Sequence, residues 1–297
     1  MLRLLPIVLL AGLVHAQPIV GTGDAAQQRA TTDAGVPAAN ETTVIDSRPP
    51  SENDPVGPYG QPRWTDRRRF PATRVYVAPP GSATFEFWFE PKVSSDGSPM
   101  RLRSMYEMSF GLGHRLQLDL YLRLQHKGTD PMQLESERVE LRYALADWGV
   151  IPGNPTLYLE WIRPTVDPQR VELKLLLGGQ LSPRLFWGAN LFWERELWGG
   201  PQESEYGATL GLSYSLLDSK LSLGAEAKVE FVDHRTTRFN PDEIELLLGP
   251  CISWRPIPNA HVLLVAFLGP EFSRPDSLTP HGAVVVFQPN LVMGWRF

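Results

Sequence analysis

The sequence lacks the features that mark several common classes of protein. It contains a single cysteine, Cys251, among 297 residues, so an intramolecular disulfide is excluded. Its apolar runs are too short for a membrane-spanning helix, and a hydrophobic content of 42% is too low for a helical membrane protein. The six histidines show no metal-ligand spacing, so we expect neither a metal nor another cofactor. The net charge of −5 gives no reason to expect nucleic acid as a partner.

The first 80 residues divide into two parts by composition. Residues 1–16 carry one positive charge, Arg3, then an apolar run, and they end on Val14, His15 and Ala16. This pattern predicts a secretory signal peptide that is cut before Gln17. Residues 17–80 are rich in Ala, Pro, Thr, Gly and Asp, and this composition predicts a disordered linker in the periplasm.

A basic cluster near the end of this linker has two interpretations. Arg67, Arg68 and Arg69 are flanked by Trp64 and Phe70. The cluster could contact peptidoglycan, lipid headgroups or a partner, or it could be a solvated charge run at the entrance of the domain that follows. The second interpretation is favoured, because blocks of like charge are usually solvated.

From residue 81 onward, apolar residues recur at every second position, which is the spacing of a β-strand with two different surroundings. In residues 116–125, five leucines alternate with polar residues such as Asp119 and Arg123. Twelve segments show this pattern: 83–90, 100–112, 116–125, 135–146, 156–163, 170–181, 185–196, 205–217, 221–232, 243–254, 260–269 and 283–297. We therefore predict an all-β fold, a transmembrane antiparallel up-and-down β-barrel of about twelve strands with a disordered N-terminal extension. An even number of strands places both termini on one side.

The connections and the aromatic residues support a barrel in a membrane. Short turns alternate with longer polar loops, as in outer-membrane barrels. Aromatic residues lie near the ends of the strands, where two interface girdles would be: Tyr214, Trp254, Trp295 and Phe297 at one end, and Phe89, Trp161, Trp193 and Trp198 at the other. A secreted β-sandwich is the competing fold, but it explains neither the girdles nor the alternating loop lengths.

The C-terminus carries a further signal. Leu291, Met293, Trp295 and Phe297 share one face of the last strand, and the sequence ends on the phenylalanine. This pattern resembles the C-terminal signature of bacterial outer-membrane β-barrels. The resemblance implies that Trp295 and Phe297 form an assembly signal read by the barrel assembly machinery, and that the protein lies in the cell outer membrane with its linker in the periplasm.

If the apolar face meets lipid, the polar face lines the lumen. The predicted lumen-lining residues, which would form the wall of a pore, are Arg101, Arg103, Glu107, Asp119, Arg123, Arg138, Glu140, Arg142, Glu160, Glu172, Lys174, Glu226, Lys228, Glu230, Glu243 and Glu245. Because unpaired buried charges cost several kcal/mol each, these side chains either pair across neighbouring strands or face water.

One part of the predicted wall is apolar on both faces. Leu263, Val265 and Phe267 face inward, as do Val284 and Val286. Two interpretations remain open. This patch could line a path for small amphiphilic or aromatic solutes, or it could pack against an inserted loop or the N-terminal segment.

We found no catalytic residues in the sequence, and we expect no enzyme. No histidine is followed two residues later by serine, the pair that resembles the base and nucleophile of outer-membrane lipid hydrolases. Asp233 and His234 are adjacent, which is the wrong spacing for the Asp-x-His pair of outer-membrane aspartyl proteases.

Three segments carry a resemblance to a family: residues 140–148 (ELRYALADW), 154–160 (NPTLYLE) and 210–226. They are similar to the uncharacterised transporter-like outer-membrane barrels that are grouped with meta-pathway phenol-degradation proteins. The resemblance covers the barrel and brings no catalytic residues. It implies a narrow channel or facilitator for small solutes, aromatic or amphiphilic ones included. A non-conducting barrel that anchors or assembles something else is the alternative. Outer-membrane lipid, the assembly machinery and a small solute are the expected partners.

Overall fold

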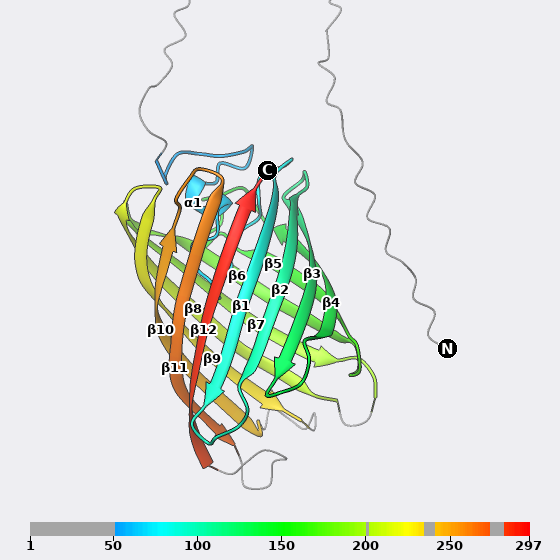
Figure 1. Cartoon of the computed structure of the whole chain (residues 1–297). Helices are drawn as coiled ribbons and strands as arrows, with labels where there is room; N and C mark the ends of the chain where they lie inside the picture. Colours follow the sequence, from blue (N-terminus) through cyan, green and yellow to red (C-terminus); the bar gives the residue numbers. More distant parts are fainter. Residues whose placement is uncertain (1–50, 200–201, 235–240, 274–281) are drawn as a thin grey trace, which may run out of the picture. The chain divides into compact units, whose positions relative to one another are not determined.

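In a computed structural model of the chain, the strands form a closed antiparallel β-barrel (Figure 1). The structure describes residues 51–199, 202–234, 241–273 and 282–297. The chain divides into two compact units, Met1–Ser47 and Arg48–Phe297, and all described residues belong to the second. The predicted signal peptide and the linker up to residue 50 lie outside the described residues.

The described residues form twelve strands, as the alternating pattern predicts. They are β1 (Ala83–Ser94), β2 (Arg101–Gly111), β3 (Leu116–Lys127), β4 (Gln133–Ala144), β5 (Thr156–Pro164), β6 (Arg170–Ser182), β7 (Leu185–Glu196), β8 (Ser204–Leu217), β9 (Leu221–Asp233), β10 (Glu243–Trp254), β11 (Ala260–Ser273) and β12 (Gly282–Arg296). Each strand pairs with its neighbours in sequence, and β1 pairs with β12. The predicted fold class is confirmed.

The last strand closes the barrel. Phe85 of β1 lies opposite Trp295 of β12, and Phe89 lies opposite Leu291. The backbone N–H of Phe297 donates to the carbonyl of Ala83 at 2.9 Å. The barrel therefore has no unpaired edge strand, which would otherwise be open to pairing with another chain.

The two faces of the wall follow the sequence pattern. On β3, Leu120 points outward and is 42% exposed, whereas its neighbour Asp119 points inward and is fully buried. Most of the predicted girdle residues are exposed on the outer face: Phe89, Trp161, Trp198, Tyr214, Trp254, Trp295 and Phe297. Trp193 is half-buried. The apolar outer face can therefore meet lipid, while the polar face is turned into the lumen.

The connections separate two ends of the barrel. The chain termini of the barrel and the shorter connections, such as the turn after β2, lie at one end, here called the terminal end (Figure 1). The connections after β1, β3, β5, β7, β9 and β11 lie at the other, here called the loop end. In the turn between β2 and β3, His114 and Arg115 both have positive φ angles of 56° and 61°, as a two-residue hairpin turn requires. None of the described helices is long and apolar enough to cross a membrane.

Residues 51–80 correct one prediction. This stretch, here called the plug, is folded at the terminal end of the barrel instead of forming part of a disordered linker. It contains one short helix, α1 (Arg63–Asp66), and its side chains Trp64, Phe70 and Val77 are 1% exposed or less. The prediction of a linker over residues 17–80 is therefore wrong for residues 51–80. The composition of the plug gives it too few apolar residues for a core of its own, but the barrel supplies the missing partners.

Candidate functional site

The plug is held in the barrel by a network of buried charges. The Glu52 carboxylate lies between the guanidinium groups of Arg69, at 2.7 Å, and Arg255, which follows β10. Arg69 also donates to the hydroxyls of Ser215 (3.3 Å) and Ser222 (2.8 Å), which are register partners on β8 and β9. Because a buried charge is costly unless it is paired and hydrogen-bonded, this network ties the start of the plug to the wall.

The same network sets the ionisation of Glu52. Burial by itself raises the pKa of this carboxyl, but the charges and hydrogen bonds of Arg255 and Arg69 outweigh burial and hold the pKa below its usual value. Glu52 is therefore ionised at neutral pH and attracts both guanidinium groups.

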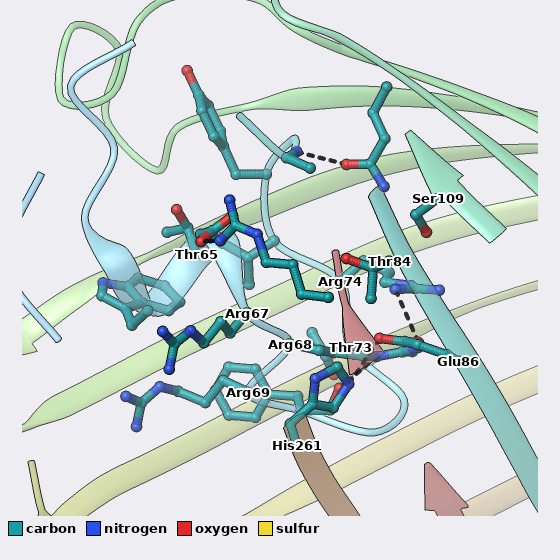
Figure 2. A pocket seen from close by; sticks show the side chains of 18 of the residues that line it. Thr65, Arg67, Arg68, Arg69, Thr73, Arg74, Thr84, Glu86, Ser109 and His261 are labelled. Atoms are coloured by element: carbon teal, nitrogen blue, oxygen red, sulfur yellow. Dashed lines mark hydrogen bonds and ion pairs between the residues drawn. The ribbon is translucent and has the colours of Figure 1, made fainter. Parts of the chain in front are cut away.

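Two further arginines of the plug reach the opposite wall. Arg74 pairs with Glu107 of β2 at 2.7 Å, and Arg68 pairs with Glu86 of β1 at 2.9 Å. The second oxygen of Glu86 lies 3.0 Å from Nε2 of His261 on β11. Figure 2 shows Arg68 and Arg74 near Glu86. The predicted basic cluster is thus split, since Arg68 and Arg69 are buried ion-pair partners of the plug and not a solvated charge run.

The wall also satisfies the backbone of the plug. The N–H groups of Ala72 (3.1 Å) and Thr73 (2.8 Å) donate to Glu226 of β9, as does the Thr73 hydroxyl (2.9 Å). The Arg74 N–H donates to Asn190 of β7 at 2.8 Å, and the Asn190 amide donates back to the Arg74 carbonyl at 2.6 Å. A segment without regular secondary structure can be buried only when its polar groups find such partners.

An apolar contact fixes the middle of the plug. Phe70 is completely buried. It packs on a cluster contributed by β10, β11 and β12: Leu247, Cys251, Val265, Phe267 and Val286. The burial of one phenylalanine stabilises a fold by about 1.5–3 kcal/mol. The interpretation in which the N-terminal segment packs on the inward apolar patch thus holds for Val265, Phe267 and Val286, whereas Leu263 packs in a separate cluster of the wall.

Glycines on neighbouring strands allow the plug to approach the wall closely. Gly178, Gly188 and Gly211 are register partners across β6, β7 and β8. A Cβ atom on Gly211 would lie 2.6 Å from Phe70, and one on Gly188 would lie 2.8 Å from Val75. Any side chain larger than hydrogen would therefore overlap the plug, so this row of glycines shapes the docking surface.

On the loop side of the plug, the lumen contains a cavity of about 250 Å³. Its floor includes Arg68, Ala72 and Arg74 of the plug, and side chains of most strands form its wall. A second cavity, of about 70 Å³, lies between the plug and the wall toward the terminal end (Figure 2). Arg68 and Arg74 line both cavities, which places the plug between the two spaces.

The wall of the larger cavity carries both signs of charge, with its arginines on one side and its lysines and most of its glutamates on the other. Its arginines, Arg103, Arg123 and Arg138, come from β2, β3 and β4, and the glutamates Glu172, Glu194, Glu205 and Glu230 come from β6 to β9. Partial pairing occurs between neighbouring strands, as for Arg138 with Glu160 at 3.5 Å, and within one strand, as for Lys174 with Glu172 at 2.9 Å. This uneven distribution of charge creates a field across the cavity, which Lys174 and Lys228 among the glutamates weaken.

The predicted lumen-lining residues all turn into the barrel, but they fall into three groups. Nine line the larger cavity: Arg103, Arg123, Arg138, Glu140, Glu160, Glu172, Lys174, Lys228 and Glu230. Glu107, Asp119, Arg142 and Glu226 lie buried at the level of the plug. Arg101, Glu243 and Glu245 lie at the loop-end portions of their strands and line neither cavity.

The residues that sequence reasoning missed belong to the plug and its docking surface. Glu52 and Thr73 lie in the stretch whose composition predicts disorder, and Gly188 and Gly211 lie within predicted strands. Two signals were present. The inward faces of β7 and β8 carry glycines, which weaken a strand and often mark the close approach of another segment. Trp64 and Phe70 are aromatic residues, which are unusual in a disordered linker.

The described residues contain no group of three or more His, Cys, Asp or Glu side chains arranged to hold a metal ion. The fold and the occupied lumen define the class of the protein as a plugged, closed β-barrel.

Comparisons with known proteins concern the fold alone. No family model and no curated protein sequence matches the chain. An outer-membrane channel from Pseudomonas putida F1 is similar in structure, with a TM-score of 0.51 and 13% sequence identity over 75% of this chain and 97% of that chain. The NanC porin has a TM-score of 0.48 and 7% identity, over 70% of this chain and 98% of that one. The translocator domain of the autotransporter NalP from Neisseria meningitidis has a TM-score of 0.43 and 13% identity, over 73% and 88%. The similarity to the Pseudomonas channel shows a shared barrel fold.

Proposed function

We propose that this protein is an outer-membrane channel for small solutes whose closed state is set by the plug. The observation that carries this proposal is the charged cavity of about 250 Å³ that ends on the plug. The plug belongs to no strand of the barrel, and no strand of the sheet pairs with it, so it can leave without opening the sheet. Displacement of the plug would join the cavity to the terminal end.

The outer membrane is the proposed location because the outer wall is apolar and carries aromatic residues near both ends. The terminal end would then face the periplasm, with the residues before the plug on that side. An epitope inserted after Thr129, in the connection at the loop end after β3, should be labelled on intact cells. Labelling only after permeabilisation would contradict this orientation.

The cavity wall suits small solutes that combine an aromatic or apolar part with a charge. Tyr158 and Phe192 lie in the wall beside its charged residues. The Lys174 ammonium is 4.4 Å from the centre of the Tyr158 ring. The arginines of β2 to β4 would attract the carboxylate of such a solute, and the rings would contact its apolar part.

Conductance measurements test the channel directly. The full chain in a planar bilayer should show low or intermittent conductance, and a variant that lacks residues 51–80 should show a stable, larger one. Liposomes that contain the variant should take up benzoate faster than liposomes without protein. Heat-modifiable migration on a gel, the usual sign of a folded barrel, is the control for folding. If the folded variant neither conducts nor takes up benzoate, the channel proposal is wrong.

A non-conducting barrel that anchors another component is the second candidate. The observation that favours it is the number of buried polar contacts between plug and wall, since a permanently docked plug would turn the barrel into a rigid scaffold. The two candidates differ in one result. If the barrel is a scaffold, the plug should stay resistant to protease in vesicles under all conditions. If the barrel is a channel, the plug should become sensitive to protease under the conditions in which the protein conducts.

The assembly signal is a separate part of the proposal. The Phe297 side chain is 73% exposed on the outer face, where the barrel assembly machinery could contact it. Deletion of Phe297 also removes its N–H donor to Ala83, so it should reduce insertion and leave the chain open to periplasmic proteases. Phe272, exposed at the far end of β11, offers a matched control, since Phe272→Ala should insert normally.

A further inference from the structure

Two Gly-Pro pairs interrupt the hydrogen-bond ladder between β10 and β11. They occupy residues 249–250 of β10 and 269–270 of β11. Of residues 246–250, all within the described part of the chain, only Leu248 has a ladder partner on β11, which is Leu268. The ladders of β10 with β9 and of β11 with β12 have no gap. Because proline lacks an N–H, the two missing donors belong to the seam between β10 and β11.

A second gap lies on the other side of β11 and β12. In the ladder between β1 and β12, residues 90–92 of β1 have no partner on β12, and the register places Pro91 opposite Pro289. β11 and β12 are paired with each other at every position from Ala260 to Ser273. Figure 1 shows these two strands side by side between β10 and β1. Both outer edges of the β11–β12 pair are therefore weakened, so the pair can shift as one unit.

The wall is thin at the seam between β10 and β11. A Cβ atom on Gly269 would overlap the carbonyl of Leu246, and one on Gly249 would overlap the carbonyl of Ala266. The backbone of the facing strand thus occupies the place of a side chain at both glycines, as is common where strand backbones approach closely. Neither glycine contributes a side chain that would cover the seam once the two backbones part.

The seam lies between two spaces. On the outer face, a hollow of about 440 Å³ is lined by residues of β8 to β11 that include Leu248 and Pro270. On the inner face, Phe267 of β11 lines the larger cavity. Thr209 and Lys228 line both spaces, so the hollow and the cavity lie at the same level of the wall. The seam therefore separates the lumen from a hollow that can meet lipid.

The side of the cavity next to the seam suits an uncharged aromatic molecule. β11 and β12 contribute Phe267, Gln288 and Asn290 to the cavity, and none of these side chains is charged. The Phe267 ring can contact an aromatic solute, which also gains free energy by leaving water. A cavity of about 150 Å³ holds benzene, so the outer hollow has room for a small aromatic solute.

We propose that the seam between β10 and β11 is a lateral portal, through which a small, uncharged aromatic solute passes between the larger cavity and the lipid. The solute enters the lumen from the loop end, and β11 and β12 move away from β10 to let it leave sideways. Because such a solute is stabilised in lipid, it needs no path past the plug. The portal requires the proposed place of the barrel in the outer membrane, but it does not require displacement of the plug.

A disulfide across the seam tests the portal. Residues directly opposite on antiparallel strands have Cα atoms about 4.5–5.5 Å apart, which a disulfide can span. The seam lock is Leu248→Cys/Leu268→Cys. The matched control is Leu141→Cys/Leu159→Cys, on β4 and β5, which lines another hollow of the outer wall, of about 620 Å³, over a ladder without a gap. Both variants also carry Cys251→Ala, so that no other thiol is present.

The measurement is uptake of the apolar dye phenylnaphthylamine by cells that express the full chain. An intact outer membrane excludes this uncharged aromatic amine, which becomes fluorescent in lipid. The oxidised seam lock should take up the dye about tenfold more slowly than the wild type, because the disulfide prevents the two strands from parting. Reduction by dithiothreitol should restore the wild-type rate. The control should take up the dye like the wild type in both states.

A second variant tests the seam without a disulfide. Pro250→Val/Pro270→Val supplies the two missing N–H donors, so it should also slow dye uptake. Single-channel conductance in a planar bilayer should be the same for the wild type, the seam lock and this variant. The portal and the proposed channel can therefore fail separately, since dye uptake reports on the first and conductance on the second.

Four results would overturn the proposal. The first is dye uptake by wild-type cells that is no faster than by cells without the protein. The second is equal uptake by the wild type and the oxidised seam lock, with heat-modifiable gel migration showing that both are folded and loss of free thiols showing that the disulfide has formed. The third is equal slowing by the seam lock and the control. The fourth is one phospholipid bound to each purified chain that the dye does not displace, which would make the hollow a lipid site. Slower uptake in the seam lock alone, reversed by dithiothreitol, supports the portal.

Discussion

The two halves of the lumen are built from the same twelve strands, yet they stabilise their charges in different ways. In the terminal half, Glu107 and Glu226 point at the plug and are fully buried. In the loop half, the side chains of Arg103 and Lys174 remain 29% and 21% exposed and face the cavity. Polar and apolar residues alternate along the strands in both halves. What differs is whether the plug fills the space or a cavity remains there.

This difference changes what the same kind of residue does. A charge beside the plug is enclosed by protein, where an ion pair is strong and an unpaired charge is costly. A charge that stays partly exposed beside the cavity, such as Arg103 or Lys174, contributes less to stability and acts through its field on whatever enters. The terminal half therefore holds the plug, and the loop half is placed to select a solute.

The largest effect is expected from filling the docking surface of the plug. The double variant Gly188→Val/Gly211→Val adds side chains where Val75 and Phe70 now lie within 3 Å of a Cβ position. The plug should leave, and single-channel conductance should rise at least tenfold, while the plug becomes sensitive to protease. Gly113→Ala, at a turn glycine with open space around it, should change neither measurement. A protected plug with wild-type conductance would refute the docking role of these glycines.

Substitutions of two arginines allow a direct comparison of the two halves of the lumen. Arg142 is 3.0 Å from Asp119 and also pairs with Glu140, and all three side chains are at most 4% exposed. Arg142→Gln leaves two buried carboxylates without their cation, so the barrel should lose about 3–5 kcal/mol of stability. Arg123 lies at the cavity wall, 4.0 Å from Glu135. Arg123→Gln should cost less than about 1 kcal/mol.

Urea unfolding in vesicles measures both costs. In a planar bilayer, Arg123→Gln should also shift the reversal potential toward cations, because it removes a positive charge from the wall of the cavity. Equal losses of stability for the two variants would show that the halves do not differ in the way described here.

A smaller loss of stability is expected from a substitution on the outer wall. Leu120 lies in the middle of β3 on the outer face, and Leu120→Arg should destabilise the barrel by about 2–4 kcal/mol if that face meets lipid. Arg123→Leu, on the inner face of the same strand, should be tolerated. Reversible unfolding in vesicles compares the two variants, and equal costs would contradict the assignment of the faces.

The smallest effect is expected at the loop end, where His234 follows β9. Partial burial lowers the pKa of His234, but hydrogen bonds and charges from Glu203, 2.7 Å from Nδ1, and Glu243, 3.4 Å from Nε2, outweigh burial and raise the pKa above 6.5. A raised pKa means that the protonated imidazole stabilises the folded state. This contribution is complete below the ordinary pKa and is lost as pH rises through the raised value.

Hydrogen exchange of the His234 N–H, which donates to Asp242 at 3.1 Å, should therefore accelerate with rising pH beyond the intrinsic rate. The His234→Gln variant, which cannot be protonated, should show only the intrinsic dependence. An NMR titration that places the pKa of His234 at or below its ordinary value would contradict the expectation.

The strands were predictable because each carries its own signal. The bounds of β7 and β10 agree with the predicted segments 185–196 and 243–254, and the other strands differ by a few residues at their ends. A period of two can be recognised from the neighbouring residues in the sequence alone. The plug has no such signal, since Thr73 and Glu226 are separated by 153 positions in the sequence. Its composition is that of a disordered segment until the partners on the wall are counted.

The sequence by itself determined the closed barrel, the direction of each side chain and the residues that can meet lipid, because alternation along a strand is a local property. Only the tertiary structure decided what fills the lumen. Phe70 packs on most of the inward apolar patch, and Arg69 and Arg74 pair with Glu52 and Glu107, through contacts that no periodicity records. The physical reason is that the surroundings of a charged side chain decide whether it stabilises or destabilises the fold. On β9, the inward Glu226 is fully buried against the plug, whereas the inward Glu230 lines the cavity and keeps its side chain 19% exposed.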